Sequence, residues 1–172
     1  MHNSQTQFGS LLSPIKPDVF FKDYFGKKPL HIPGYVEKFA GLFDWADFNR
    51  IINTGHIWNP NTFKLVLDNE QIPPAAYMPQ GVLNVKEVSE YIKQGASVVL
   101  SGMETYAEGS AALAASLQAA IGGLSRCNLY FSFKQHPGFL PHFDLMDVFV
   151  FQIDGEKDWE IFDTHFENPM LK

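Results

Sequence analysis

A histidine and an aspartate stand two residues apart in the C-terminal part of this sequence, at His142 and Asp144. In a β-strand, side chains at positions i and i+2 point to the same face. A strand here would present an imidazole and a carboxylate side by side, at a separation that one metal ion can span. Such a pair supplies two of the three ligands of the 2-His-1-carboxylate arrangement that binds non-heme Fe(II). The spacing makes His142 and Asp144 candidate metal ligands, and the residues that follow them strengthen the case.

The residues around this pair have the pattern of β-strands. Apolar and aromatic residues dominate three stretches, which predict strands at Leu129–Phe133, His142–Ile153 and Trp159–Phe162. The last two stretches are apolar on both faces, which is typical of strands that are covered on both sides. Their aromatic residues are therefore expected to lie in the core of a β-structure.

The pattern of apolar and capping residues predicts that the part of the chain before residue 126 is mainly helical. Capping residues followed by apolar side chains at helical spacing predict helices that begin at Asp18, Asp44, Asn84 and Ser110. Short strands are expected at 63–67 and 97–100, and an extended entry strand at 27–34. Residues 1–17 are expected to be a flexible lead-in.

Helices followed by a run of strands indicate one α+β domain. A chain of 172 residues is long enough for one domain with its own core and too short for two. We place this domain at residues 18–172. It has an N-terminal α/β part at 18–125 and a strand-rich part at 126–172.

Composition narrows the classes of function. The formal net charge of −6 disfavours a nucleic-acid partner, because phosphates require a basic surface, and it suits a basic protein substrate. The N-terminal residues lack the apolar length of a signal peptide or a membrane span. The single Cys127 gives neither a disulfide within the chain nor a cysteine cluster for zinc. We therefore expect a cytoplasmic protein that does not contact a membrane.

The segment that follows Pro141 resembles a known motif. Residues His142–Trp159 fit the pattern H-x-D-x-x-D-V-F-x-x-Q-x-x-G-x-K/R-x-W of the JmjC-type, cupin-fold oxygenases, specifically their ribosomal-oxygenase-like branch. Lys28-Pro29-Leu30, after an aromatic helix, is similar to the N-terminal entry of that branch. In other surroundings, His142 and Asp144 would be interpreted as a local pair on a surface strand. The fixed spacings favour a metal site instead.

The resemblance implies an Fe(II)- and 2-oxoglutarate-dependent hydroxylase. Its fold would be a double-stranded β-helix (a cupin or jelly roll) with the N-terminal helices packed on it and its first strands within 126–172. His142 and Asp144 match the first two iron ligands. Lys157 matches the basic residue that binds the distal carboxylate of 2-oxoglutarate, and a cation on a long stem suits that task. Asn128 and Tyr130 match a pair that lines the co-substrate pocket.

The resemblance also bears on the substrate. It implies the side chain of a protein, such as a histidine or arginine of a basic ribosomal protein. The sequence leaves a small-molecule substrate open as an alternative.

The family pattern continues beyond what this sequence contains. The third iron ligand should be a histidine in a later G-D-x-x-x-x-P-x-x-x-x-H segment, whereas the only histidine after the pair is His165, in a turn-like context. The barrel is therefore expected to be incomplete at its C-terminal end, so that the chain is part of a longer protein or is completed by a partner. Open strand edges favour self-association, which predicts a homo-oligomer.

Two other classes of function stay open. A catalytically incomplete, cupin-like module for binding or assembly would account for the absent third ligand. A cupin metalloenzyme that does not use 2-oxoglutarate, such as an isomerase, would need no cation at Lys157.

Overall fold

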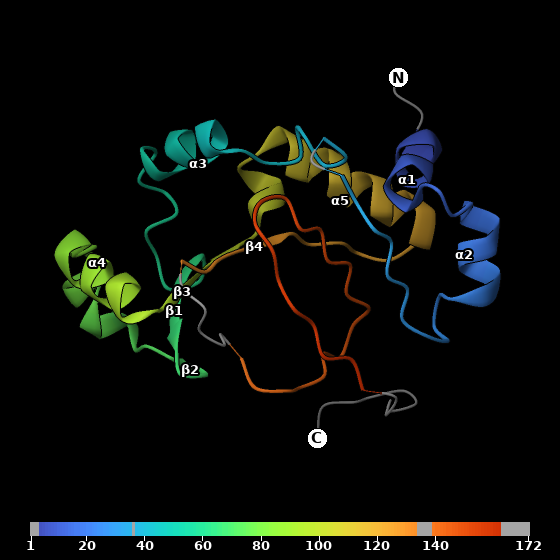
Figure 1. Ribbon diagram of the computed structural model, residues 1–172. Coiled ribbons are helices and arrows are strands. Elements are labelled where there is room, and N and C mark those ends of the chain that lie inside the picture. Colours follow the sequence, from blue (N-terminus) through green and yellow to red (C-terminus); the bar gives the residue numbers. More distant parts are fainter. Residues whose placement is uncertain (1–3, 36, 134–138, 163–172) are drawn as a thin grey trace.

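The computed structural model of the chain describes residues 4–35, 37–133 and 139–162 (Figure 1). Its helices are α1 (Ser4–Leu12), α2 (Pro17–Asp23), α3 (Trp45–Ile52), α4 (Val85–Gln94) and α5 (Glu108–Ile121). Its strands are β1 (Phe63–Leu67), β2 (Glu70–Gln71), β3 (Ser97–Ser101) and β4 (Asn128–Phe131). Short 3-10 helices lie between them at η1 (Pro74–Ala76), η2 (Pro79–Gly81) and η3 (Met103–Thr105). The predicted α+β class is confirmed for this part of the chain.

The strands form one antiparallel sheet in the order β2-β1-β3-β4. β1 and β2 are joined by Asp68 and Asn69, whose φ angles of 51° and 69° are those that tight hairpin turns require. β3 is central and almost entirely buried, and β4 lies at one edge of the sheet. As an edge strand, β4 can carry exposed functional side chains.

Two clusters of buried side chains form the core. The first packs β1 and β3 against residues of α3 and α4, and includes the fully buried Leu65 and Tyr77. The second joins α1, α2 and α5 through Phe8, Phe20 and Leu117. Burial of each large apolar side chain contributes about 1.5–3 kcal/mol, so each cluster stabilises the packing of its own elements. Figure 1 shows α1 and α2 beside α5, and α4 at the opposite end of the molecule.

Helices α3 and α4 begin where the sequence predicts. The Asp44 carboxylate accepts a hydrogen bond from the Asp47 amide at 2.8 Å, and the Asn84 side chain accepts from two amides in the first turn of α4. These bonds satisfy amides that have no partner within the helix. α4 ends at Gly95, whose φ of +115° favours glycine. The capping residues thus fixed these boundaries locally.

The prediction of a flexible lead-in is wrong for residues 4–12, which form α1. Phe8 and Leu12 are buried in the same cluster as Leu113 and Leu117 of α5. A helix of this length is marginal on its own and is stabilised mainly by packing of its apolar face. That packing partner lies about a hundred residues away in sequence, so the local pattern did not reveal the helix.

Two predicted helix starts are also corrected. α2 begins after Lys16 with Pro17 at its first position, a place that favours proline, and not at Asp18. α5 begins after Ala107, and Ser110 is buried within it instead of capping it. Within the described ranges, no helix has the length and apolar character needed to cross a membrane.

The strands predicted at His142–Ile153 and Trp159–Phe162 are not formed. Residues 139–162, drawn orange to red in Figure 1, have irregular backbone, as do residues 27–34. A β-strand is stabilised by hydrogen bonds to a neighbouring strand, and β4 has such a partner on one side only in the described part of the chain. The sheet observed is therefore small, and the closed double-stranded β-helix expected from the resemblance is not formed by these residues.

Candidate metal and co-substrate site

Strand β4 presents the two predicted co-substrate residues on one face. Asn128 and Tyr130 are exposed, whereas Leu129 and Phe131 are half-buried against the core. This alternation follows from the two-residue period of a strand. The prediction that Asn128 and Tyr130 share a face is confirmed.

The opposite face of β4 is anchored to α3 by aromatic packing. The Phe131 ring centroid lies 4.9 Å from that of Phe48 and 5.7 Å from that of Trp45. Aromatic pairs at such distances add about 0.5–1.5 kcal/mol to the burial of their surfaces. Because Phe131 is fixed inward, the neighbouring Tyr130 is directed outward.

The start of β4 is held by η3 through the residue that precedes it, Cys127. The Met103 amide donates to the Cys127 carbonyl at 2.8 Å, and the Cys127 amide donates to Glu104 Oε2 at 2.8 Å. Burial of the thiol, together with the Glu104 carboxylate, raises the pKa of Cys127. Two bonds at one residue fix where β4 begins, and hence where Asn128 and Tyr130 stand.

One aromatic ring connects the predicted metal ligand His142 to β4. The Phe139 centroid lies 6.1 Å from that of Tyr130 in an edge-to-face arrangement, and 5.8 Å from that of His142. Both separations lie in the range of favourable aromatic pairs. The structure therefore brings both Tyr130 and His142 into contact with the Phe139 ring, although His142 is not in a strand.

The orientation of His142 suits a metal ligand. Its Nδ1 lies 2.7 Å from the carbonyl oxygen of Leu140. A carbonyl oxygen only accepts, so Nδ1 carries the proton of the neutral ring and Nε2 keeps a lone pair. Metal-bound histidines commonly donate their second N–H in this way. With the exposed Asp144 two residues on, an imidazole nitrogen and a carboxylate oxygen are available, and this donor chemistry fits Fe(II).

Asp144 and Lys157 are not brought into contact with the rest of the predicted site. The Lys157 ammonium lies over the ring of Trp159, 4.4 Å from its centroid, in a cation–π contact. In the described residues, no hydrogen bond or ion pair joins Asp144 or Lys157 to β4 or to His142. Nor do three His, Cys, Asp or Glu side chains there lie close enough to hold a metal. His165 lies outside the described residues.

The segment after His142 is anchored to the N-terminal part of the chain by alternate residues. Phe149 lies 6.0 Å from Phe20 of α2, and Phe151 lies 5.2 Å from Phe39 at 90°, both measured between ring centroids. Val148 and Val150 are exposed. Of the two apolar faces of this segment, the face that carries the phenylalanines therefore packs against described residues, and the face that carries the valines is exposed.

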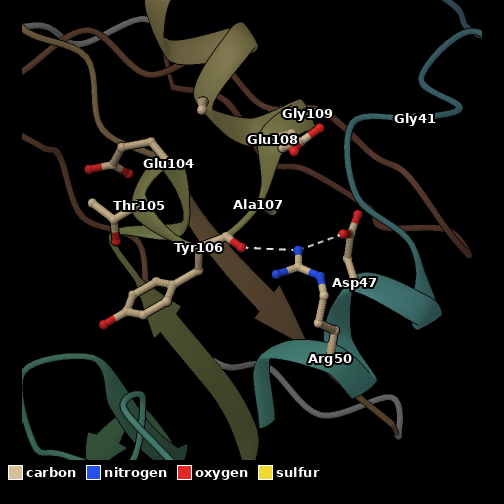
Figure 2. Close-up of a pocket in the computed structure, with 10 residues that line it drawn as sticks. Gly41, Asp47, Arg50, Glu104, Thr105, Tyr106, Ala107, Glu108 and Gly109 are labelled. Atoms are coloured by element: carbon tan, nitrogen blue, oxygen red, sulfur yellow. Dashed lines mark hydrogen bonds and ion pairs between the residues drawn. The ribbon is translucent and has the colours of Figure 1, made fainter. Parts of the chain in front are cut away.

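A separate hollow of about 640 Å³ lies between α3 and the start of α5 (Figure 2). Arg50 donates to the Asp47 carboxylate at 2.9 Å and to the Tyr106 carbonyl at 3.1 Å, so it ties α3 to the residues after η3. The carboxylates of Glu104 and Glu108 also line the hollow. None of the five predicted site residues lines it, and we interpret its arginine as a structural link.

Phe139 and Glu104 are the residues near the candidate site that the sequence did not reveal. The only signal for Phe139 was an aromatic residue just before the His-x-Asp pair. For Glu104 there was no signal, since its bond to Cys127 spans 23 residues.

Comparison with known proteins supports the predicted relationship. Residues 105–171 match the JmjC domain family. The chain is 29% identical over 153 residues to the bifunctional lysine-specific demethylase and histidyl-hydroxylase NO66 of Branchiostoma floridae, covering 88% of this chain and 25% of that protein. It is 26% identical over 166 residues to ribosomal oxygenase 1 of Danio rerio, covering 95% of this chain and 30% of that protein. The chain is related to the JmjC ribosomal oxygenases.

The match to these JmjC proteins covers only part of them. The chain spans about a quarter to a third of the length of the curated relatives it matches, and this holds also for ribosomal oxygenase 2 of Mus musculus, at 34% of that protein. The JmjC match begins at η3 and takes in β4 and all five predicted site residues. The resemblance inferred from the His-x-Asp motif is therefore confirmed for the segment that carries it.

Proposed function

We propose that this chain provides part of the active site of an Fe(II)- and 2-oxoglutarate-dependent dioxygenase that hydroxylates an amino-acid side chain of a protein. The observation that carries the proposal is the arrangement of His142: its Nε2 is available, the exposed Asp144 follows two residues later, and the Phe139 ring contacts both His142 and Tyr130. The relationship to proteins named as ribosomal oxygenases supports the reaction class.

Each residue has a role that its chemistry suits. His142 Nε2 and the Asp144 carboxylate would hold Fe(II), which with 2-oxoglutarate and O₂ supplies the oxidising power for hydroxylation when bound. Lys157 would bind the distal carboxylate of 2-oxoglutarate through a charge-assisted hydrogen bond. Asn128 and Tyr130 would line the co-substrate site from β4 and donate hydrogen bonds to it. The protein thus contributes binding and orientation.

The proposed substrate is a basic protein, such as a ribosomal protein. Between residues 139 and 162 the chain carries six carboxylates and one lysine, which gives the site segment a negative character. Opposite charge speeds encounter and selects partners more than it adds affinity. The names of the relatives, which include histidyl-hydroxylase and ribosomal oxygenase, support a protein side chain as the group that is hydroxylated.

Binding of 2-oxoglutarate tests the proposed site. Calorimetric titration into the full-length protein with Mn(II) in place of Fe(II) should show binding that Lys157→Ala weakens about ten-fold or more, because a hydrogen bond to a charged group contributes about 1.5–3 kcal/mol. Lys86→Ala, which removes an exposed lysine of α4, is the matched control. Absence of binding to the wild type would contradict the proposed function, and equal binding by Lys157→Ala would contradict the role of that lysine.

A second candidate function is assembly of the chain into a homo-oligomer. The exposed apolar side chains of the site segment favour it, with Leu140 66%, Met146 70% and Ile161 62% exposed. Apolar surface of this kind beside an edge strand favours pairing with another copy. Light scattering at micromolar concentration should give a mass above that of one chain. A monodisperse monomer would contradict this candidate.

A further inference from the structure

We propose that Phe139 is a positioning residue for His142: its ring contacts both the imidazole and Tyr130 of β4, and so fixes the imidazole relative to that strand. The inference rests on the proposed function, because the direction of His142 Nε2 matters only if that nitrogen binds a metal. Phe139 lies outside the His-x-Asp motif, and its proposed role is to orient the metal ligand His142.

Phe139 bridges two segments of the site, strand β4 and the segment that contains His142. Its ring meets Tyr130 edge-on, with an interplanar angle of 81°, and meets His142 at 57°. The Phe139 side chain is 44% exposed and Tyr130 is 51% exposed, so neither is part of the core. The contact therefore lies outside the core cluster that contains the buried residues of β1 and β3.

Two restraints together fix the direction of Nε2. The hydrogen bond from Nδ1 to the Leu140 carbonyl sets which nitrogen carries the proton, but it forms only while the ring keeps its angle about the Cβ–Cγ bond. The Phe139 ring restrains rotation about this Cβ–Cγ bond from the side. A ligand that is already oriented loses less freedom when the metal binds, so binding is tighter. Partners that orient a metal-bound histidine typically change metal affinity by about 10–100-fold.

The same contact couples the metal ligand to the predicted co-substrate residue. Tyr130 stands on β4, whose start is fixed at Cys127 by η3, so its position is set by the folded sheet. Because the Phe139 ring packs against both Tyr130 and His142, it restrains His142 relative to this strand. The segment that contains His142 can therefore hold its imidazole at a fixed position relative to β4, although it is not a strand.

Three variants of the full-length protein test the inference. Phe139→Ala removes the ring, Phe139→Tyr keeps it, and Phe162→Ala removes a phenylalanine that is 58% exposed outside this contact. The first measurement needs no metal: NMR spectra of the neutral imidazole report its tautomer and its proximity to the ring of residue 139. The second measurement is the Mn(II) affinity, from water proton relaxation.

We expect the wild type, Phe139→Tyr and Phe162→Ala to show one His142 tautomer, protonated at Nδ1, with close contacts to the aromatic protons of residue 139. Phe139→Ala should show a mixture of tautomers and bind Mn(II) about ten-fold more weakly. If Phe139→Ala keeps the wild-type tautomer and affinity, the inference is wrong while the proposed function stands. If the tautomer changes but the wild type binds no Mn(II), the proposed function fails and the positioning contact stands.

Discussion

Removal of the Glu104 carboxylate tests whether η3 fixes the start of β4. Glu104→Ala leaves the Cys127 amide without the acceptor that it now reaches at 2.8 Å. An amide that loses its partner in a partly buried place costs about 1–3 kcal/mol, and we expect this loss in the free energy of unfolding. Glu104→Gln keeps an acceptor oxygen at the same position and should lose less than half as much.

Urea unfolding measures the free energy, and hydrogen exchange measures the Cys127 amide itself. The matched control is Glu90→Ala, which removes an exposed carboxylate paired with Lys93 on α4 and should change stability by less than about 1 kcal/mol. If Glu104→Ala is as stable as this control, and exchange of the Cys127 amide is unchanged, then the Glu104 carboxylate does not hold the start of β4.

The pKa of the Cys127 thiol gives an independent test of the contact between Glu104 and Cys127. Burial and the Glu104 carboxylate both raise its pKa, in that order of importance. Glu104→Gln removes the charge, so the pKa should fall but stay above its ordinary range because burial remains. Since the thiolate is the reactive form, the pH profile of alkylation should shift to lower pH. An unchanged profile would show that the carboxylate does not act on the thiol.

Two further substitutions test local features of the fold. Gly109→Ala should destabilise the protein by about 1–3 kcal/mol, because a methyl group there would clash with the backbone oxygen of Gly41. An unchanged thermal midpoint would show that the loop around Gly41 shifts without cost. Asn84→Ala should lower the free energy of unfolding by about 1 kcal/mol through loss of the α4 cap, with Asn84→Asp retaining most of it; equal urea midpoints for all three proteins would contradict the capping role.

The sequence predicted those elements whose signals are local. β1 at Phe63–Leu67 and the caps Asp44 and Asn84 depend on neighbouring residues, and all three were predicted correctly. The helix α1 was not predicted because it depends on packing between Phe8 and α5, far along the chain. The strands expected after His142 depend on a partner strand that the described residues do not supply. Elements that depend on neighbouring residues could therefore be predicted, whereas elements that depend on contacts far along the chain could not.

The candidate site divides in the same way. The shared face of Asn128 and Tyr130 follows from the period of a strand and was predicted. The contact of Phe139 with both Tyr130 and His142 depends on how the chain returns to β4, and only the structure reveals it. Spacing in sequence identified the chemical groups, whereas their arrangement required the fold.

Turnover of 2-oxoglutarate by the full-length protein tests the central claim most directly. With Fe(II) and O₂ present, the wild type should form succinate, chelation of the iron should stop the reaction, and His142→Ala should abolish it. Asp158→Ala, which removes an exposed carboxylate of the same segment, should keep the activity. Undiminished succinate formation by His142→Ala, or the absence of iron-dependent turnover in the wild type, would contradict the assignment of His142 as a ligand of a 2-oxoglutarate-dependent oxygenase.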